Sequence, residues 1–405
     1  MCQNRSMAEQ PTRDDIDLRS GAFWAGDHHE ALRWMRAEAP VYWDGAVWGI
    51  SRYQDVKDVS RNPDVFSSAG GIRPGFPALP MMIDMDDPAH FQRRKLVNKG
   101  FTPRRVRDTE PAVREACAQI LDGVCERGEA DLVTDVAAHL PMIMIGDALG
   151  VPVHQRADLL RWSDDMVKGQ DAAATAEQLE AAGNAFAEYW AYASGAIAER
   201  REHPTDDLMS VLVHAEVDGD RLTDEEIVHE SLLILVGGDE TTRHVISGGM
   251  HQLLLQHDQW DQLAADPALR PSAVEEMLRW VTPIKNMVRT ATRATTLRDQ
   301  KIAEGDELML LYPSANRDED VFADPFRFDV ARSPNEHLAF GFGAHFCLGN
   351  SLARLEISVI LEQIQERLPD LALADPAAPV EMRPANFISG VEHLPVTFTP
   401  SAPVG

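Results

Sequence analysis

Cysteine is scarce in this sequence, and its spacing gives no sign of a disulfide framework. The 405 residues contain four cysteines, Cys2, Cys117, Cys125 and Cys347. Cys117 and Cys125 are eight positions apart on a predicted helix, about 12 Å along its axis, which is too far for an S–S bond. This usage is typical of a reducing compartment, so we predict a cytoplasmic protein.

Long apolar runs and positive charge are also missing. No stretch of about 18 residues is both apolar and free of charge, and the N-terminus is polar, which predicts neither a membrane span nor a signal peptide. The 38 Lys and Arg are outnumbered by 65 Asp and Glu, giving a formal net charge of -27. Such a charge argues against nucleic acid or an anionic membrane as a partner.

The interior of the chain has no linker, repeat or low-complexity block. With 44% hydrophobic residues it can bury one large core, although length alone would suggest two or three domains. We predict a flexible tail over residues 1–17 and a single domain over 18–405, with helical periodicity over 109–200 broken at 150–152. Short strands are predicted at 41–43, 46–50, 286–291, 308–312 and 396–398, the last at a sheet edge. The predicted class is mainly α with small β-sheets.

The stretch 340–349, FGFGAHFCLG, carries the most distinctive chemistry. Its glycines allow tight turns beside a bulky or flat group, and Cys347 has no second cysteine nearby. A helix is predicted from Asn350 to about Arg367, so we expect Cys347 to lie at a helix N-terminus that favours the thiolate. A thiolate in such a loop suits haem iron in an enzyme that cleaves an O–O bond. A buried structural cysteine is the alternative.

A second unusual stretch lies within a long predicted helix. A capping box at 223–226 starts this helix, which is expected to end near Leu255, about 48 Å away. Its middle, 237–241, reads GGDET. Each mid-helix glycine costs about 1 kcal/mol, and buried acids must be paired or hydrated. We interpret the stretch as an opening for a ligand with a proton path; an irregular helix with a polar patch is the alternative.

Two pairs of charged residues share helix faces. His90 and Arg94 are four positions apart, and Glu276 and Arg279 are three apart, so each pair points in one direction. By itself the first pair is as well explained by a solvated helix face, and the second by an ordinary ion pair.

A basic island covers residues 91–107, which contain seven Lys and Arg and no Asp or Glu, in an otherwise acidic chain. It is either a solvated face or a docking site for an acidic electron donor.

Phe340, Gly343, Cys347 and Gly349 fill the pattern F-x-x-G-x-x-x-C-x-G, which resembles the cysteine-ligand loop of the cytochrome P-450 family of haem-thiolate monooxygenases. The resemblance extends over the chain from about residue 20 and includes the two helix pairs and the GGDET stretch in the family's order. It implies one large helical fold, with haem b between the long central helix and the cysteine loop and its following helix.

The resemblance also implies roles for individual residues. Cys347 is the implied axial ligand of the haem iron, and Glu240 and Thr241 are the implied acid and alcohol of oxygen activation. The implied structural brace before the cysteine loop is Glu276 and Arg279, completed by Arg327. The implied haem contacts are His90, Arg94, Arg289 and His345 at the propionates, with Gly237, Gly238, Phe340 and Gly349. The implied substrate pocket is roofed by a loop at 67–80 and lined by Phe76, Met81, Met82, Ile284, Met287, Val288, Phe387 and Ile388.

Within the family, the chain looks similar to bacterial steroid side-chain oxidases that hydroxylate the terminal methyl of cholesterol or cholest-4-en-3-one, on to the acid. The implied partners are a lipophilic substrate, O₂, and a ferredoxin with its reductase. The donor is expected to dock near Arg93, Lys95, Lys99, Arg104 and Arg105. Alternatives are a branched fatty acid or terpenoid substrate, a peroxide-driven enzyme, and a haem sensor or lipid carrier without turnover.

Overall fold

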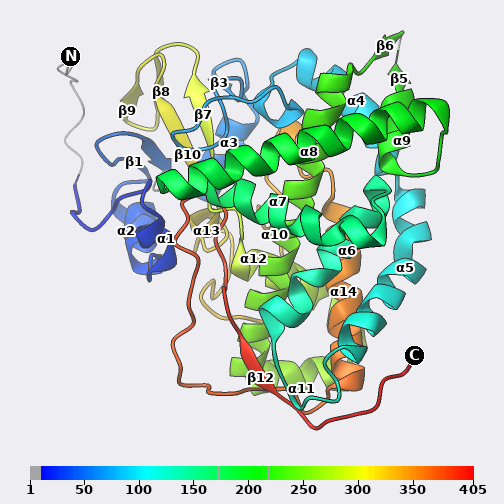
Figure 1. Cartoon of the computed structure of the whole chain (residues 1–405). Coiled ribbons are helices and arrows are strands. Elements are labelled where there is room, and N and C mark those ends of the chain that lie inside the picture. The colour runs from blue at the N-terminus through cyan, green and yellow to red at the C-terminus, as the bar shows by residue number, and fades with distance from the viewer. Residues whose placement is uncertain (1–10, 171–173, 218) are drawn as a thin grey trace.

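The computed structural model describes residues 11–170, 174–217 and 219–405, and helices make up most of it (Figure 1). The predicted class, mainly α with small β-sheets, is confirmed. The α-helices in the described part are α1 (Gly21–Ala25), α2 (His29–Glu38), α3 (Tyr53–Ser60), α4 (Ala89–Val97), α5 (Pro103–Asp122), α6 (His139–Leu149), α7 (Arg156–Lys168), α8 (Ala176–Glu202), α9 (Leu208–His214), α10 (Asp224–Leu255), α11 (His257–Ala265), α12 (Arg270–Val281), α13 (Tyr312–Ala315) and α14 (Asn350–Arg367).

The strands form small sheets at the periphery of the helical body. The strands are β1 (Val41–Trp43), β2 (Trp48–Ile50), β3 (Phe66–Ser67), β4 (Glu129–Asp131), β5 (Glu216–Val217), β6 (Asp220–Arg221), β7 (Asn286–Ala291), β8 (Thr295–Leu297), β9 (Gln300–Ile302), β10 (Glu307–Leu311), β11 (Ala372–Leu373) and β12 (Pro395–Thr397). The largest sheet has the order β1-β2-β10-β7-β3 and includes the predicted hairpin and the predicted strands near 286 and 308. The strand predicted at 396–398 is present as β12, but its predicted position at a sheet edge is wrong, because β12 pairs with β11 on one side and β4 on the other.

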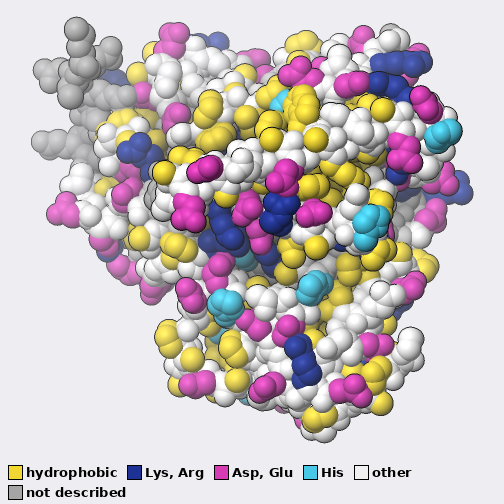
Figure 2. Space-filling model, in the orientation of Figure 1, with side chains coloured by type: hydrophobic (Ala, Val, Ile, Leu, Met, Phe, Trp, Pro, Cys, Tyr) yellow, Lys and Arg dark blue, Asp and Glu magenta, His cyan; other side chains and the backbone are white. Residues whose placement is uncertain are grey.

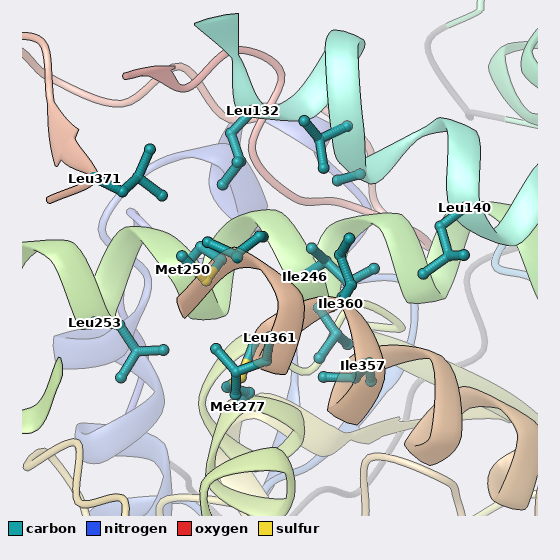
Figure 3. Packing of buried hydrophobic residues seen from close by; sticks show 14 of the residues in the cluster. Leu132, Leu140, Ile246, Met250, Leu253, Met277, Ile357, Ile360, Leu361 and Leu371 are labelled. Atoms are coloured by element: carbon teal, nitrogen blue, oxygen red, sulfur yellow. The ribbon is translucent and has the colours of Figure 1, made fainter. Parts of the chain in front are cut away.

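Helix α10 passes through the middle of the molecule and starts at the predicted capping box. The Thr223 side chain accepts from the backbone N–H of Glu226, and the Glu226 side chain accepts from that of Thr223. The C-terminal half of α10 is core: Figure 3 shows Ile246, Met250 and Leu253 facing side chains from α14 and from the segment that leads into α6. Burying each such side chain stabilises the fold by about 1.5–3 kcal/mol. This packing holds α10 against α14, the helix that follows the cysteine loop.

Residues 13–17 of the predicted tail contact the folded body. Residues 1–10 of the predicted tail lie outside the described residues, but Ile16 is buried with the core around α2, and Arg13 Nη1 donates to Glu30 Oε1 at 2.9 Å. An apolar residue and an arginine at the right spacing therefore attach residues 13–17 to the fold.

The predicted helical region over 109–200 is interrupted at places that the pattern did not show, one of them between the end of α7 at Lys168 and the start of α8 at Ala176. Besides the predicted break at 150–152, β4 and an irregular helical turn, Leu132–Ala137, separate α5 from α6. One window, Leu132–Leu149, is long and apolar enough to cross a membrane, but 67% of it is buried inside the protein. Its hydrophobicity is explained by packing against α10 and α5.

Acidic side chains are scattered over the surface. Figure 2 shows them across the whole of one face, with basic side chains between them. On this face the excess negative charge is therefore spread out and does not form one patch.

Candidate functional site

The loop that carries Cys347 is shaped by its glycines. Gly341 and Gly343 have φ values of +70° and +76°, in the left-handed region that side chains disfavour. A Cβ on Gly343 would lie 2.8 Å from the carbonyl oxygen of Ser60, so only glycine lets the loop pack on α3. The loop closes where Cys347 N–H donates to the carbonyl oxygen of Phe340 at 2.9 Å. This turn presents the thiol to a cavity.

The start of α14 does not by itself make Cys347 a thiolate, contrary to the prediction. Burial raises the pKa of the Cys347 thiol above its ordinary value, and the N–H groups of Gly349 and Asn350 and the Arg94 guanidinium only oppose this rise. The expected stabilisation by the helix start is present, but desolvation is the larger effect.

Cys347 lies in a cavity of about 190 Å³ between α10 and the cysteine loop, here called the cysteine cavity. Gly237 and Thr241 of α10, together with Phe340 and Gly349, also line it. A Cβ added to Gly237 or Gly349 would meet no atom within 4 Å, so both glycines widen the space beside the thiol.

Gly238 has a different role from its neighbour. It touches the same cavity, but a Cβ there would lie 2.6 Å from the Cδ1 of Ile145 on α6. Its missing side chain therefore serves the close packing of α6 on α10.

Cationic and imidazole groups gather at one rim of the cysteine cavity. His90 and Arg94 of α4 and His345 of the cysteine loop line it, and the rings of the two histidines are 4.2 Å apart. His90 Nε2 is buried and has no partner among the described residues. Burial and the nearby Arg289 lower the pKa of His345 to about 3, which places the Arg289 guanidinium close to this rim. The rim offers several N–H donors to an anionic group.

The two acids in the middle of α10 have opposite protonation states. The carboxylate oxygens of Asp164, Asp239 and Glu240 lie within 4.8 Å of one another. Burial and the adjacent Glu240 raise the pKa of Asp239 to about 8. Burial alone would also raise the pKa of Glu240, but His244, Arg243 and Arg383 hold it well below its usual range. At neutral pH Asp239 therefore carries a proton, and Glu240 carries the charge.

Cations already surround this acidic cluster. Arg243 bonds with both Glu240 and Asp164, and Arg383 Nη1 donates to Glu240 Oε2 at 2.7 Å. Glu240 does not line the cysteine cavity, whereas Thr241 does, with its hydroxyl donating to the carbonyl oxygen of Gly237 at 2.8 Å. The predicted acid therefore lies behind the predicted alcohol.

Sequence reasoning missed two carboxyl groups near this site. Asp239 was seen only as part of a polar stretch. Glu356 of α14 is buried and lines the cysteine cavity, and burial, with the nearby Asp239 as the smaller cause, raises its pKa to about 8. A single glutamate on the apolar face of the predicted α14 was the available signal.

The Glu276–Arg279 pair is present, but its third member was predicted wrongly. Arg279 donates to both carboxylate oxygens of Glu276 at 2.7 Å, and both side chains are fully buried. The further guanidinium on Glu276 comes from Arg332, whose Nε donates to Oε2 at 3.0 Å. The side chain of Arg327 is exposed, and the residue takes part only through its carbonyl oxygen, which accepts from Arg279.

A second cavity, of about 370 Å³ and here called the apolar cavity, adjoins the first. Residues that line both cavities are Ile83, Leu233, Gly237, Thr241, Ile284 and Met287. Of the predicted pocket residues, the apolar cavity also contains Phe76, Met81, Phe387 and Ile388, and the cysteine cavity contains Met82. The loop at 67–80 contributes Ile72, Arg73, Phe76 and Leu79, as a roof would.

Val288 is the predicted pocket residue that lies elsewhere. Successive residues of a strand point to opposite faces, so Met287 and Val288 of β7 cannot share one. Met287 faces the cavities, and Val288 is buried against the core around α2.

The basic island is less available than predicted. Arg93 is largely buried, and it bonds with Glu226 and Glu230 at the start of α10. Lys95, Lys99 and Arg104 are exposed, while Arg105 is half-buried and donates to the carbonyl oxygen of Asp206.

The residues around the cysteine cavity fit a haem. A single soft ligand, Cys347, faces two glycines that leave room for a flat group, and an unpartnered buried imidazole nitrogen lies at a rim rich in N–H donors. A metal held by thiolate and a planar ring with two carboxylate groups would satisfy these features together.

Comparisons with known proteins agree with this geometry. Residues 256–368 match the family model described as Cytochrome P450. The chain is 55% identical over 401 residues to a "Steroid C26-monooxygenase" of Mycobacterium tuberculosis, covering 98% of this chain and 100% of the relative. It is 38% identical to a "Methyl-branched lipid omega-hydroxylase" of Mycobacterium bovis, covering 95% of each. The solved Mycobacterium marinum cytochrome P450 CYP268A2, in complex with pseudoionone, superimposes with a TM-score of 0.87 at 36% identity, covering 96% of this chain and 100% of that one. The chain therefore belongs to the cytochrome P450 family.

Proposed function

We propose that this protein is a haem b monooxygenase that uses O₂ and two electrons from a ferredoxin to hydroxylate the terminal methyl group of a sterol side chain. The observation that carries the proposal is the apolar cavity, whose inner end is the same Thr241 and Gly237 surface that faces Cys347. A long lipophilic molecule can fill it and place one end beside the thiolate ligand. The 55% identity to a steroid C26-monooxygenase supports a sterol.

Each part of the cysteine cavity has a task toward the haem. Cys347 would supply the thiolate ligand of the haem iron, and His90, Arg94, His345 and Arg289 would hold the carboxylate side groups by charge and hydrogen bonds. The bound haem supplies the oxygen chemistry that inserts one atom of O₂ into a C–H bond.

The polar residues of α10 supply protons. Of the α10 residues that line both cavities, Thr241 has a polar side chain, so its hydroxyl is placed to donate a hydrogen bond there once it releases Gly237. Behind it, the Asp239 carboxyl holds a proton while Glu240 stays ionised between Arg243 and Arg383. A neutral acid next to a fixed carboxylate can pass on a proton without exposing a free charge in the core.

The electron donor is proposed to be an acidic ferredoxin that docks near Lys95, Lys99, Arg104 and Arg105. Lys95 lies on α4, which also carries His90 and Arg94 at the rim of the cysteine cavity, and the other three follow between the end of α4 and the first turns of α5. Local positive charge in a chain of net charge -27 would steer an acidic partner to this place. Arg93 is not part of this surface, because its charge is already paired inside. We place the reaction in the cytoplasm.

The test begins with the absorption spectrum of the reduced, CO-treated protein, which should show the band of a thiolate-ligated haem. Cys347→Ser is the control and should lose that band. Cholesterol and cholest-4-en-3-one are then supplied with a surrogate ferredoxin, its reductase and NADPH, and the products are identified by mass spectrometry. A terminal alcohol or acid is the expected product. A haem protein that forms no product with any lipid would be a sensor or carrier and would contradict the proposal.

A methyl-branched lipid is the second candidate substrate, because one relative with this printed activity is 38% identical over 95% of the chain. Titration of the ferric absorption band discriminates between the two. Tighter binding of branched fatty acids than of both sterols would replace the sterol proposal by this one.

A further inference from the structure

Few polar side chains line the apolar cavity. Among its described lining residues, the charged or strongly polar ones are Arg73, Gln170, His229 and Thr241. Thr241 belongs to the reacting end. A sterol carries a single oxygen, on the ring farthest from its side chain, so one of the other three is expected to meet it.

His229 is held in one orientation. Its Nδ1 lies 2.8 Å from the carbonyl oxygen of Glu225, one turn earlier on α10. The ring packs edge-on against Trp190 of α8 with a centroid separation of 5.5 Å, and against Phe186 at 6.1 Å. A carbonyl oxygen only accepts hydrogen bonds, so Nδ1 must carry the hydrogen. In the neutral imidazole, Nε2 on the opposite edge is then an acceptor.

The distance along α10 matches a sterol. His229, Leu233, Gly237 and Thr241 follow one another at intervals of four, so each lies about one turn from the next, and all four line the apolar cavity. The twelve residues from His229 to Thr241 span about 18 Å. This is comparable to the length of a sterol whose side chain is extended. A molecule with its terminal methyl at Thr241 therefore has its ring oxygen near His229.

Arg73 offers the opposite chemistry. Its guanidinium can only donate, and its Nη1 is already bonded to Asp84 Oδ2 at 2.8 Å. A ring ketone would suit Arg73, whereas a ring hydroxyl, which can donate, suits the Nε2 acceptor of His229. The two residues thus predict different preferences between sterols of the same shape.

We propose that His229 Nε2 accepts a hydrogen bond from the ring hydroxyl of a 3-hydroxysterol and so selects the hydroxysterol over the corresponding 3-ketone. The inference rests on the proposed function. It assigns His229 as a specificity-determining residue that positions the substrate from the end remote from the reacting carbon.

The test compares dissociation constants for cholesterol and cholest-4-en-3-one, measured by the shift of the ferric absorption band of the holoprotein. The wild type should bind the hydroxysterol about 2–10-fold more tightly, the range that one net hydrogen bond gives. His229→Phe keeps the size of an aromatic ring without the acceptor, so the ratio should fall to about one. His229→Gln retains an acceptor oxygen and should keep part of the preference. Phe186→Leu, a change of volume without polarity, should weaken both sterols to a similar degree.

Product analysis gives a second readout. Without the remote anchor the sterol can slide along α10, so His229→Phe should form more alcohols at inner side-chain carbons relative to the terminal one. A purely structural role of His229 would lower haem content or affinity for both sterols without changing either ratio.

Failure of this inference differs from failure of the proposed function. Terminal hydroxylation with a ratio that favours the ketone, or a ratio that His229→Phe and His229→Gln leave unchanged, overturns the role of His229 alone. If neither sterol binds to the wild type, the proposed function fails and the inference fails with it.

Discussion

Two buried glutamates in this protein have similar neighbours and different chemistry. Glu276 and Glu240 each lie on a helix three positions before an arginine, Arg279 and Arg243, and each receives a second guanidinium from a distant part of the chain. Around Glu276 every carboxylate oxygen is used: Arg279, Arg332, Asn335 and the backbone N–H of Asp329 all donate to it. The neighbouring acid, Glu275, is ionised, because against the effect of burial the hydrogen bonds from His337 and Arg354 lower its pKa to about 2.

The Glu240 network is open by contrast, in that it includes an acid whose oxygens accept no hydrogen bond from the described residues. Its neighbour Asp239 is fully buried, and neither of its carboxyl oxygens has a partner among the described residues. An unpaired buried acid is expensive, so a fold selected for stability alone would replace it. The comparison indicates that a closed ion-pair network braces the chain, whereas an open one keeps a proton available next to the cavity.

The largest effect is expected from opening the closed network. Arg332→Ala leaves the Glu276 charge partly unpaired in the interior, and such a loss typically costs about 3–5 kcal/mol. The protein should unfold at a lower temperature and retain little haem. Arg327→Ala is the matched control, because its exposed side chain should change the free energy of unfolding by no more than about 0.5 kcal/mol. Thermal unfolding and the CO spectrum measure both. A larger loss for Arg327→Ala would restore the original prediction.

A change in the open network should affect turnover more than folding. Glu240→Gln removes the fixed charge beside Asp239, so proton delivery should slow turnover by about 10²-fold per haem. The solvent deuterium isotope effect on turnover should rise, since proton transfer becomes limiting. Glu392→Gln is a suitable control because it removes another partner of Arg383 and keeps Glu240. Equal losses in the two variants would mean that Glu240 only supports the fold.

Replacing Thr241 is expected to lower the amount of product formed per NADPH more than the rate at which NADPH is consumed. Thr241→Ala removes the hydroxyl that faces both cavities, so product formed per NADPH consumed should fall several-fold while peroxide rises. Thr241→Ser keeps the hydroxyl and should stay close to the wild type. Product, peroxide and NADPH are measured in the same reaction. An unchanged product yield in Thr241→Ala would contradict the assigned role.

Local signals in the sequence explain what could be predicted. The capping box located the start of α10, and the glycines around Cys347 located the turn that presents the thiol, because both depend on nearby residues. Choices among candidates far apart in the chain were less certain. Arg327 and Arg332 lie in one segment, and only the path of that segment decides which guanidinium reaches Glu276.

One error could have been avoided from the sequence. Met287 and Val288 are adjacent in a predicted strand, so both could not face one pocket. The protonation states were harder to predict. Whether Asp239 or Glu240 keeps its charge depends on Arg383, which is more than a hundred positions away and reaches α10 only in the folded chain.

The effect of neutralising Asp239 on the free energy of unfolding should grow with pH. Burial raises the pKa of Asp239 from 3.8 to about 8, so the folded state holds this proton more tightly than the unfolded state. The resulting stabilisation is complete below the unfolded pKa and is lost as pH rises from 3.8 toward 8. Asn cannot ionise, so Asp239→Asn should gain stability relative to the wild type as pH rises through this window, by up to about 1.4 kcal/mol per pH unit. Glu230, whose pKa is raised to about 7, titrates in both proteins, so the comparison uses the difference in melting temperature between variant and wild type. Glu356 contributes to the same difference, because Asp239 is the smaller cause of its raised pKa. A difference that stays constant with pH would mean that Asp239 is already ionised and paired, and the contrast between the two networks would then disappear.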